Sequence, residues 1–192
     1  SRAMSVISRN FAKNNRYILM EEKYSYPKDV LEFVALCADY CRCLEQCQQA
    51  SRKDFVDSML AALPALYVKI SQLQPNQQGE DGYNEPHVTE GDYEFIRSSV
   101  AMVMKEHDDY LDVFVEDFKY SDQPILQTVS ENLADIYQVL RDFLEIFRSG
   151  YEDAIDVALI EVKEDFRYNS GQKILNALRA LHDSKYGGRS DA

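Results

Sequence analysis

The 192-residue chain has no tryptophan, few glycines and prolines, and no apolar run near the roughly 18 residues of a membrane-spanning helix. Its composition, with 45% hydrophobic and 28% charged residues, excludes a collagen-like, rod-like or largely disordered chain. No short apolar segment near the start is typical of a signal peptide. We therefore expect a soluble, cytoplasmic, globular protein.

Several motifs of catalysis and nucleic-acid binding are also missing. The chain has no glycine-rich phosphate loop, no nucleophile elbow, and no interleaving of basic with aromatic residues. It has only three histidines, which is few for a metal-dependent phosphohydrolase. Its net charge of −12 opposes attraction to nucleic acid or to anionic lipid. We expect no nucleic-acid partner, no membrane partner and no bound organic cofactor.

The negative charge is concentrated in the middle of the chain. Residues 75–166 contain 23 acidic and 6 basic residues, a net charge of −17, whereas both flanking segments are slightly positive. Such a field attracts metal cations or a basic partner. A surface that serves only solubility is the alternative interpretation.

Helical periodicity dominates the sequence. Apolar residues recur at three- and four-residue spacing, and we find no strand pattern. Prolines and capping-box patterns mark the helix starts. The spacing predicts helices over residues 27–49, 51–74, 89–115, 124–149 and 151–185, the last with a bend at 169–171. Their mostly short connections predict an all-α antiparallel bundle of five to six long helices.

The ends of the chain and one internal segment lack this periodicity. Residues 1–26 are expected to be a tag remnant followed by a loosely ordered arm, and residues 187–192 a flexible tail. Residues 75–91 contain two prolines and three glycines, which predicts a long loop. We expect residues 27–186 to form one domain.

The cysteines do not form a zinc motif. Cys37, Cys41, Cys43 and Cys47 lack the paired two-residue spacing of a zinc site, and one straight helix cannot direct all four at one ion. Cys37 and Cys41 fall on the apolar stripe of the first predicted helix. We expect them to be small buried side chains.

A candidate metal site lies at His107, Asp108 and Asp112. His107 is in phase with the apolar stripe of the third predicted helix, and the two aspartates lie on its edge. A histidine with carboxylates can bind a divalent cation or transfer protons. A buried histidine held by a hydrogen bond is the alternative, and we favour it. His182 approaches His107 if the last helix packs beside the third.

A stripe of acidic residues forms the second candidate site. Glu131, Asp135, Asp142 and Glu145, with Gln138 among them, stack on one face of the fourth predicted helix. Carboxylates arranged in this way can bind Mg²⁺ or a basic protein. A solvated helix face is the alternative interpretation.

Three stretches of the sequence are similar to a bacterial family. The runs EHDDYLDVFVEDFKYSDQPI, SENLADIYQVLRDFLEIFRSG and GQKILNALRALHDSKY resemble the domain of unknown function 5063 over about residues 27–186. The resemblance implies an all-helical cytoplasmic protein and implies no catalytic residues. Together with the charge, the sequence favours a binding or scaffold module for a basic protein partner. A metal-dependent hydrolase of phosphate esters or nucleotides is the alternative.

Overall fold

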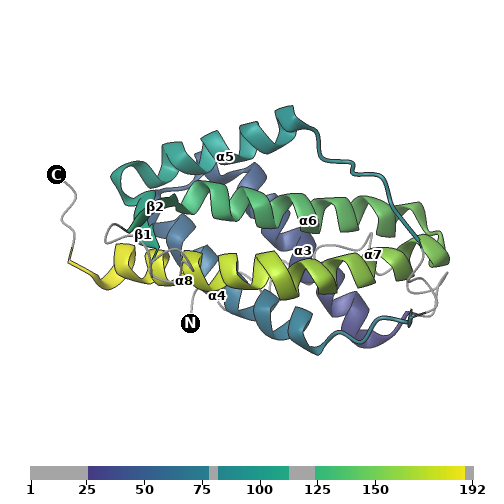
Figure 1. Cartoon of the computed structure of the whole chain (residues 1–192). Helices are drawn as coiled ribbons and strands as arrows, with labels where there is room; N and C mark the ends of the chain where they lie inside the picture. The colour runs from purple at the N-terminus through teal and green to yellow at the C-terminus, as the bar shows by residue number, and fades with distance from the viewer. Residues whose placement is uncertain (1–25, 78–81, 113–123, 189–192) are drawn as a thin grey trace.

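The structure, a computed structural model, describes residues 26–77, 82–112 and 124–188. Four predicted parts lie wholly or partly outside the described residues: residues 1–25 of the predicted arm, part of the predicted loop at 75–91, the end of the third predicted helix (113–115) and most of the predicted tail. The described chain forms helices packed side by side, with a two-stranded sheet at one end of them (Figure 1).

Helix α6 lies at the centre of the arrangement. It packs against α3, α5, α7 and α8, while α4 packs against α3 and α8. The helix bounds are Lys28–Glu45 (α3), Arg52–Gln72 (α4), Glu90–Met104 (α5), Val129–Ser149 (α6), Glu152–Asp165 (α7) and Gly171–Tyr186 (α8). This arrangement confirms the predicted all-α bundle. No helix among the described residues is long and apolar enough to cross a membrane.

The predicted apolar stripes meet in one core. Buried side chains from α3 to α8 form a single cluster, which includes Cys37 and Cys41 as expected. Burial raises the pKa of both thiols, because a thiolate loses its hydration there. The hydroxyl of Tyr40 on α3 donates a hydrogen bond of 2.7 Å to the carbonyl of Leu133 on α6. This bond satisfies a buried polar group between two helices.

The predicted capping box at Thr89 is formed in full, whereas at Ser51 the structure shows only the side-chain half of the predicted box. The Thr89 side chain accepts a bond of 3.1 Å from the Asp92 backbone N–H, and the Asp92 carboxylate accepts one of 3.0 Å from the Thr89 N–H. The Ser51 hydroxyl accepts a bond of 3.1 Å from the Asp54 N–H at the start of α4. These bonds satisfy donors that a helix start leaves free.

The third predicted helix is shorter than its periodicity indicates. It ends at Met104, because Lys105 adopts φ 51° and ψ −128°, which interrupts helical geometry. His107 lies in a 3₁₀ turn, Lys105–His107. The backbone then forms strand β1, Asp109–Asp112, which pairs antiparallel with β2, Ile125–Thr128. The prediction of no strands was therefore wrong, and so was the prediction that Pro124 opens a helix.

The predicted bend in the last helical region is a π-helical turn over Phe166–Ser170 that joins α7 to α8. Gly171 begins α8 directly after it. A Cβ atom at Gly171 would lie 2.5 Å from the Phe166 carbonyl oxygen and 3.3 Å from the Phe166 ring. The wider π turn thus brings a backbone oxygen close to a position that only glycine fits.

We therefore expect Gly171→Ala to destabilise the protein by about 1–3 kcal/mol, because backbone atoms must move to admit the methyl group. Gly91→Ala is the matched control, since its Cβ would meet only the Thr89 hydroxyl, at 3.7 Å. In α5 this change should be neutral or stabilising by under about 1 kcal/mol. Urea unfolding followed by circular dichroism measures both. Equal effects would contradict the packing argument.

Candidate functional site

His107 is a buried residue that connects two parts of the fold. The residue is 4% exposed, and its Nδ1 atom lies 2.8 Å from the Ser184 hydroxyl near the end of α8. His182, whose approach to His107 depended on how the last helix packs, is exposed, and its ring is tilted against that of Tyr186 with 4.8 Å between ring centroids. His107 therefore fastens the 3₁₀ turn to α8 through Ser184.

Asp108 holds the start of α6. Its two carboxylate oxygens accept bonds of 2.7 Å each from the Ser130 backbone N–H and hydroxyl, and its carbonyl accepts one of 2.8 Å from the Val129 N–H. Burial raises the pKa of the Asp108 carboxyl, although the bonds from Ser130 oppose this shift. A carboxylate at a helix N-terminus also interacts favourably with the helix dipole.

Two of the three predicted metal ligands, His107 and Asp108, contact different partners. Asp112 lies on β1 opposite Ile125, while His107 contacts Ser184 and Asp108 contacts Ser130. Within the described residues, no group of three or more His, Cys, Asp or Glu side chains is placed to hold a metal ion. The contacts of His107 and Asp108 support the structural interpretation of this segment.

The acidic stripe on α6 forms hydrogen bonds and ion pairs with other described residues, which the sequence did not predict. Asp135 accepts a bond of 2.8 Å from the Tyr93 hydroxyl and pairs with Lys173 at 2.7 Å. Glu145 pairs with Arg141 at 2.7 Å and with Arg148 at 3.1 Å. Asp135 therefore links α6 to two other helices, and Glu145 links successive turns of α6.

Asp142 binds the backbone of the loop that leads to α5. One of its oxygens accepts bonds of 2.8 Å and 2.7 Å from the N–H groups of His87 and Val88. Of the four predicted stripe acids, Glu131 alone is exposed. Three of the four acids therefore form hydrogen bonds or ion pairs within the fold. Asp142 also lines a pocket.

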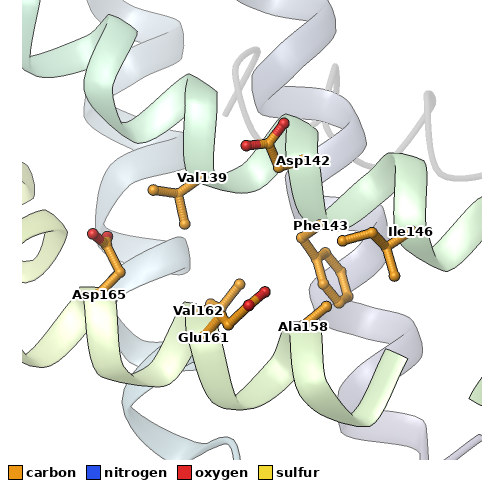
Figure 2. Close-up of a pocket in the computed structure, with 8 residues that line it drawn as sticks. All are labelled: Val139, Asp142, Phe143, Ile146, Ala158, Glu161, Val162 and Asp165. Atoms are coloured by element: carbon orange, nitrogen blue, oxygen red, sulfur yellow. The ribbon is translucent and has the colours of Figure 1, made fainter. Parts of the chain in front are cut away.

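This pocket lies between α6 and α7 and has a volume of about 160 Å³. Figure 2 shows four residues from each helix around it, with the carboxylate of Asp165 pointing from α7 toward α6. Five lining residues are apolar and three are acidic: Val139, Phe143, Ile146, Ala158 and Val162, with Asp142, Glu161 and Asp165. The pocket therefore combines an apolar lining with carboxylates.

The loop before α5 fixes two of these carboxylates. Glu161 accepts a bond of 3.3 Å from the Asn84 backbone N–H, and the Asn84 side chain donates one of 3.0 Å to the Ala154 carbonyl. Asp142 is held by the same loop, as described above. The loop thus holds one acid from each helix, Asp142 from α6 and Glu161 from α7.

Asp165 differs from the other two acids. Its Oδ1 atom accepts a bond of 3.2 Å from Asn169 in the π-helical turn. Its Oδ2 atom is buried, and no donor among the described residues reaches it. A buried oxygen without a donor costs free energy of roughly 1–3 kcal/mol.

No described lysine, arginine or histidine forms an ion pair with Asp142, Glu161 or Asp165. Lys163, which lies between two of them in the sequence, donates instead to the carbonyls of Ile70 and Ser71 at 2.9 Å and 2.6 Å. The three acids therefore leave the pocket with uncompensated negative charge, which suits a cationic group.

Residues 24–187 match the family described as a domain of unknown function, DUF5063. This match covers most of the chain. The protein belongs to the DUF5063 family. A comparison with curated proteins finds no match for this DUF5063 chain.

A solved structure shares the DUF5063 chain's fold. Protein BF1032 from Bacteroides fragilis is 38% identical to it, and the match covers 86% of this chain and 97% of that one with a TM-score of 0.75. The name of that protein indicates no activity. The comparison therefore supports the fold, and any function of this DUF5063 chain has to be argued from its own residues.

Sequence reasoning missed two of the three pocket acids in the DUF5063 chain. Glu161 and Asp165 lie one turn apart on α7, and Asp142 lies on a different helix. The four-residue spacing of the α7 acids was the available signal. It does not reveal which helix faces them, so the pocket becomes visible only when α6 and α7 are placed side by side.

Proposed function

We propose that the protein is a binding module that holds a basic protein partner at the pocket between α6 and α7. The observation that carries the proposal is the group of three acids, unpaired with any described base, around an apolar lining. The net charge of −17 over residues 75–166 supports it, because a field of that sign attracts a basic partner and speeds its association.

The size of the pocket favours a side chain over a nucleotide. Sites for drug-sized ligands have volumes of roughly 300–1,000 Å³. The α6–α7 pocket is about 160 Å³. The binding-module interpretation thus agrees with the pocket better than a hydrolase of nucleotides does. A metal-dependent hydrolase of phosphate esters or nucleotides stays a prediction, and no group of three or more possible ligands is placed to hold a metal ion in the described residues.

Binding of a labelled peptide to the full chain tests this function. The probe is a short peptide in which lysine and arginine alternate with serine. Its binding is measured by fluorescence anisotropy at about 0.15 M salt, where surface charges are substantially screened. We expect the double variant Glu161→Gln, Asp165→Asn to weaken binding by about tenfold, which corresponds to about 1.4 kcal/mol.

The control removes the same charge from the same helix. Glu164 and Asp153 are exposed on α7 and do not line the pocket. Glu164→Gln with Asp153→Asn should change the Kd by less than about twofold, since surface charges have small individual effects. Equal loss in both variants would mean that net charge alone attracts the peptide and would overturn the proposal. Failure of the unaltered protein to bind would also overturn it.

A further inference from the structure

The last helix, α8, exposes a stripe of side chains along its outer side (Figure 1). Ile174, Ala177 and Leu181 are buried on the side that packs against α4 and α6. On the opposite side, exposed residues recur at alternating spacings of three and four, which is the spacing of a seam that packs against a second helix. We call this stripe the α8 seam, and its members are Gln172, Leu175, Arg179, His182 and Tyr186.

The α8 seam carries apolar and aromatic side chains that are open to solvent. Leu175 is 48% exposed and Tyr186 is 63% exposed. Tyr168, in the π-helical turn directly before α8, is 71% exposed. Tyrosine and arginine are enriched among the residues that contribute most to protein–protein interfaces. A helix face that combines these residue types with an exposed leucine is therefore typical of a docking surface.

Neighbouring side chains hold the aromatic rings of this face. The His182 and Tyr186 rings have their centroids 4.8 Å apart, and the Nζ atom of Lys185 lies 5.2 Å from the centroid of the Tyr186 ring. The Arg167 guanidinium lies 5.3 Å from the centroid of the Tyr168 ring. A side chain that is already restricted loses less conformational entropy when a partner binds. These contacts therefore reduce the free-energy cost of docking on this face.

The charge of this region is opposite in sign to that of the whole chain. Residues 167–186 contain four basic residues and one acidic residue, whereas the chain has a net charge of −12. The two lysines of this range pair with aspartates on α6 and α4. No ion pair among the described residues involves Arg167 or Arg179. Guanidinium groups bind carboxylates through two parallel hydrogen bonds, so this face is complementary to an acidic partner.

We propose that the α8 seam binds an acidic amphipathic helix of a partner protein. The apolar stripe of that helix packs against Leu175 and Tyr186, and its carboxylates pair with Arg179 and Arg167. The seam shares no residue with the α6–α7 pocket, so the inference goes beyond the proposed function and does not depend on it. A second copy of the chain is the less favoured occupant, because two seams face to face bring like charges together.

Binding of a designed helical peptide to the full chain tests this inference. The probe is a labelled peptide of about three heptads, with leucine at the a and d positions and glutamate at the e and g positions, which also opposes pairing of the peptide with itself. Binding is measured by fluorescence anisotropy at about 0.15 M salt. We expect the same peptide with glutamine in place of glutamate to bind at least about fivefold more weakly, because it cannot form ion pairs with the arginines. Equal affinity of the two peptides would overturn the assignment to an acidic helix.

Two double variants locate the binding surface. Leu175→Ala with Arg179→Glu should weaken binding of the glutamate peptide by about tenfold or more, because an apolar contact and a complementary charge are lost. Leu126→Ala with Lys53→Glu is the matched control, since it makes the same apolar and charge changes at exposed positions on β2 and α4. The control should change the Kd by less than about twofold. Circular dichroism establishes that both variants are folded. Equal loss in both, or no binding by the unaltered protein, would overturn the proposal.

Sedimentation velocity of the protein alone tests the other occupant. A chain that stays monomeric at the concentrations of the titration agrees with a separate acidic partner. If the chain instead forms a dimer that Leu175→Ala with Arg179→Glu dissociates, the seam binds a second copy and the assignment to a partner helix is overturned. The basic peptide that tests the α6–α7 pocket should bind this double variant and the unaltered protein alike, so a failure at one site is distinguishable from a failure at the other.

Discussion

Asp108→Ala should destabilise the protein by about 3 kcal/mol, among the largest effects of any single polar change in this fold. Asp108 is 8% exposed, and its carboxylate accepts hydrogen bonds of 2.7 Å from both the backbone N–H and the hydroxyl of Ser130. Its removal leaves a buried hydroxyl and a backbone N–H without those acceptors. The variant also loses a negative charge beside the N-terminus of α6.

Urea unfolding at neutral pH measures this effect, with stability compared through the midpoint at constant m value. Asp108→Asn keeps one acceptor oxygen and should lose less, about 1–2 kcal/mol. The neighbouring Asp109→Ala serves as the control, because Asp109 is exposed on β1, and should cost under about 0.5 kcal/mol. Similar losses in the Asp108→Ala and Asp109→Ala variants would contradict a supporting role for Asp108.

Local periodicity was sufficient to predict the helices because each helix buries one face against the same core. The stripe on α3, for example, contains Val30, Val34 and Leu44, which are all buried. The capping box at Thr89 and Asp92 was equally readable, since its two residues are three apart and bond to each other. In both cases the information lies within one element.

The end of α5 could not be predicted in the same way. His107 continues the apolar phase of the helix, yet the helix ends because Lys105 adopts a positive φ. A positive φ is usually indicated by a glycine, and this position has a lysine. The two short strands that follow depend on residues far apart in the chain, with Asp109 opposite Thr128 and Asp112 opposite Ile125. Such pairing is a tertiary property that helical periodicity conceals.

The pocket shows the same distinction on the functional side. The excess of acid over residues 75–166 was visible in the sequence and indicated a basic partner. The position of the pocket depends on α6 facing α7, and Asp142 is oriented by backbone N–H groups of His87 and Val88. Backbone donors carry no side-chain signal, so sequence alone interprets Asp142 as part of a helix face.

His107→Ala provides the second large effect, an expected loss of about 2–3 kcal/mol, because it creates a cavity and removes the contact to α8. His107 is 4% exposed, and its Nδ1 atom lies 2.8 Å from the Ser184 hydroxyl. Ser184→Ala should cost about 1 kcal/mol through the same hydrogen bond. His182→Ala is the control, because His182 is exposed, and should cost under about 0.5 kcal/mol.

The stability of the His107→Ala variant and of the unaltered protein is measured with and without a chelator, and with added Mg²⁺, Mn²⁺ or Zn²⁺. This comparison decides whether His107 has a structural role or binds a metal ion. If His107 is structural, His107→Ala lowers the free energy of unfolding by the same amount with and without the chelator. A metal-bound His107 gives the unaltered protein a melting temperature that rises with the ion and falls with the chelator, as expected for a ligand that binds only the folded state. In that case His107→Ala would abolish the metal response with little loss of stability in chelator, since clustered acids repel one another without their ion. Because His107 contacts Ser184 while Asp108 binds Ser130, we expect the first outcome.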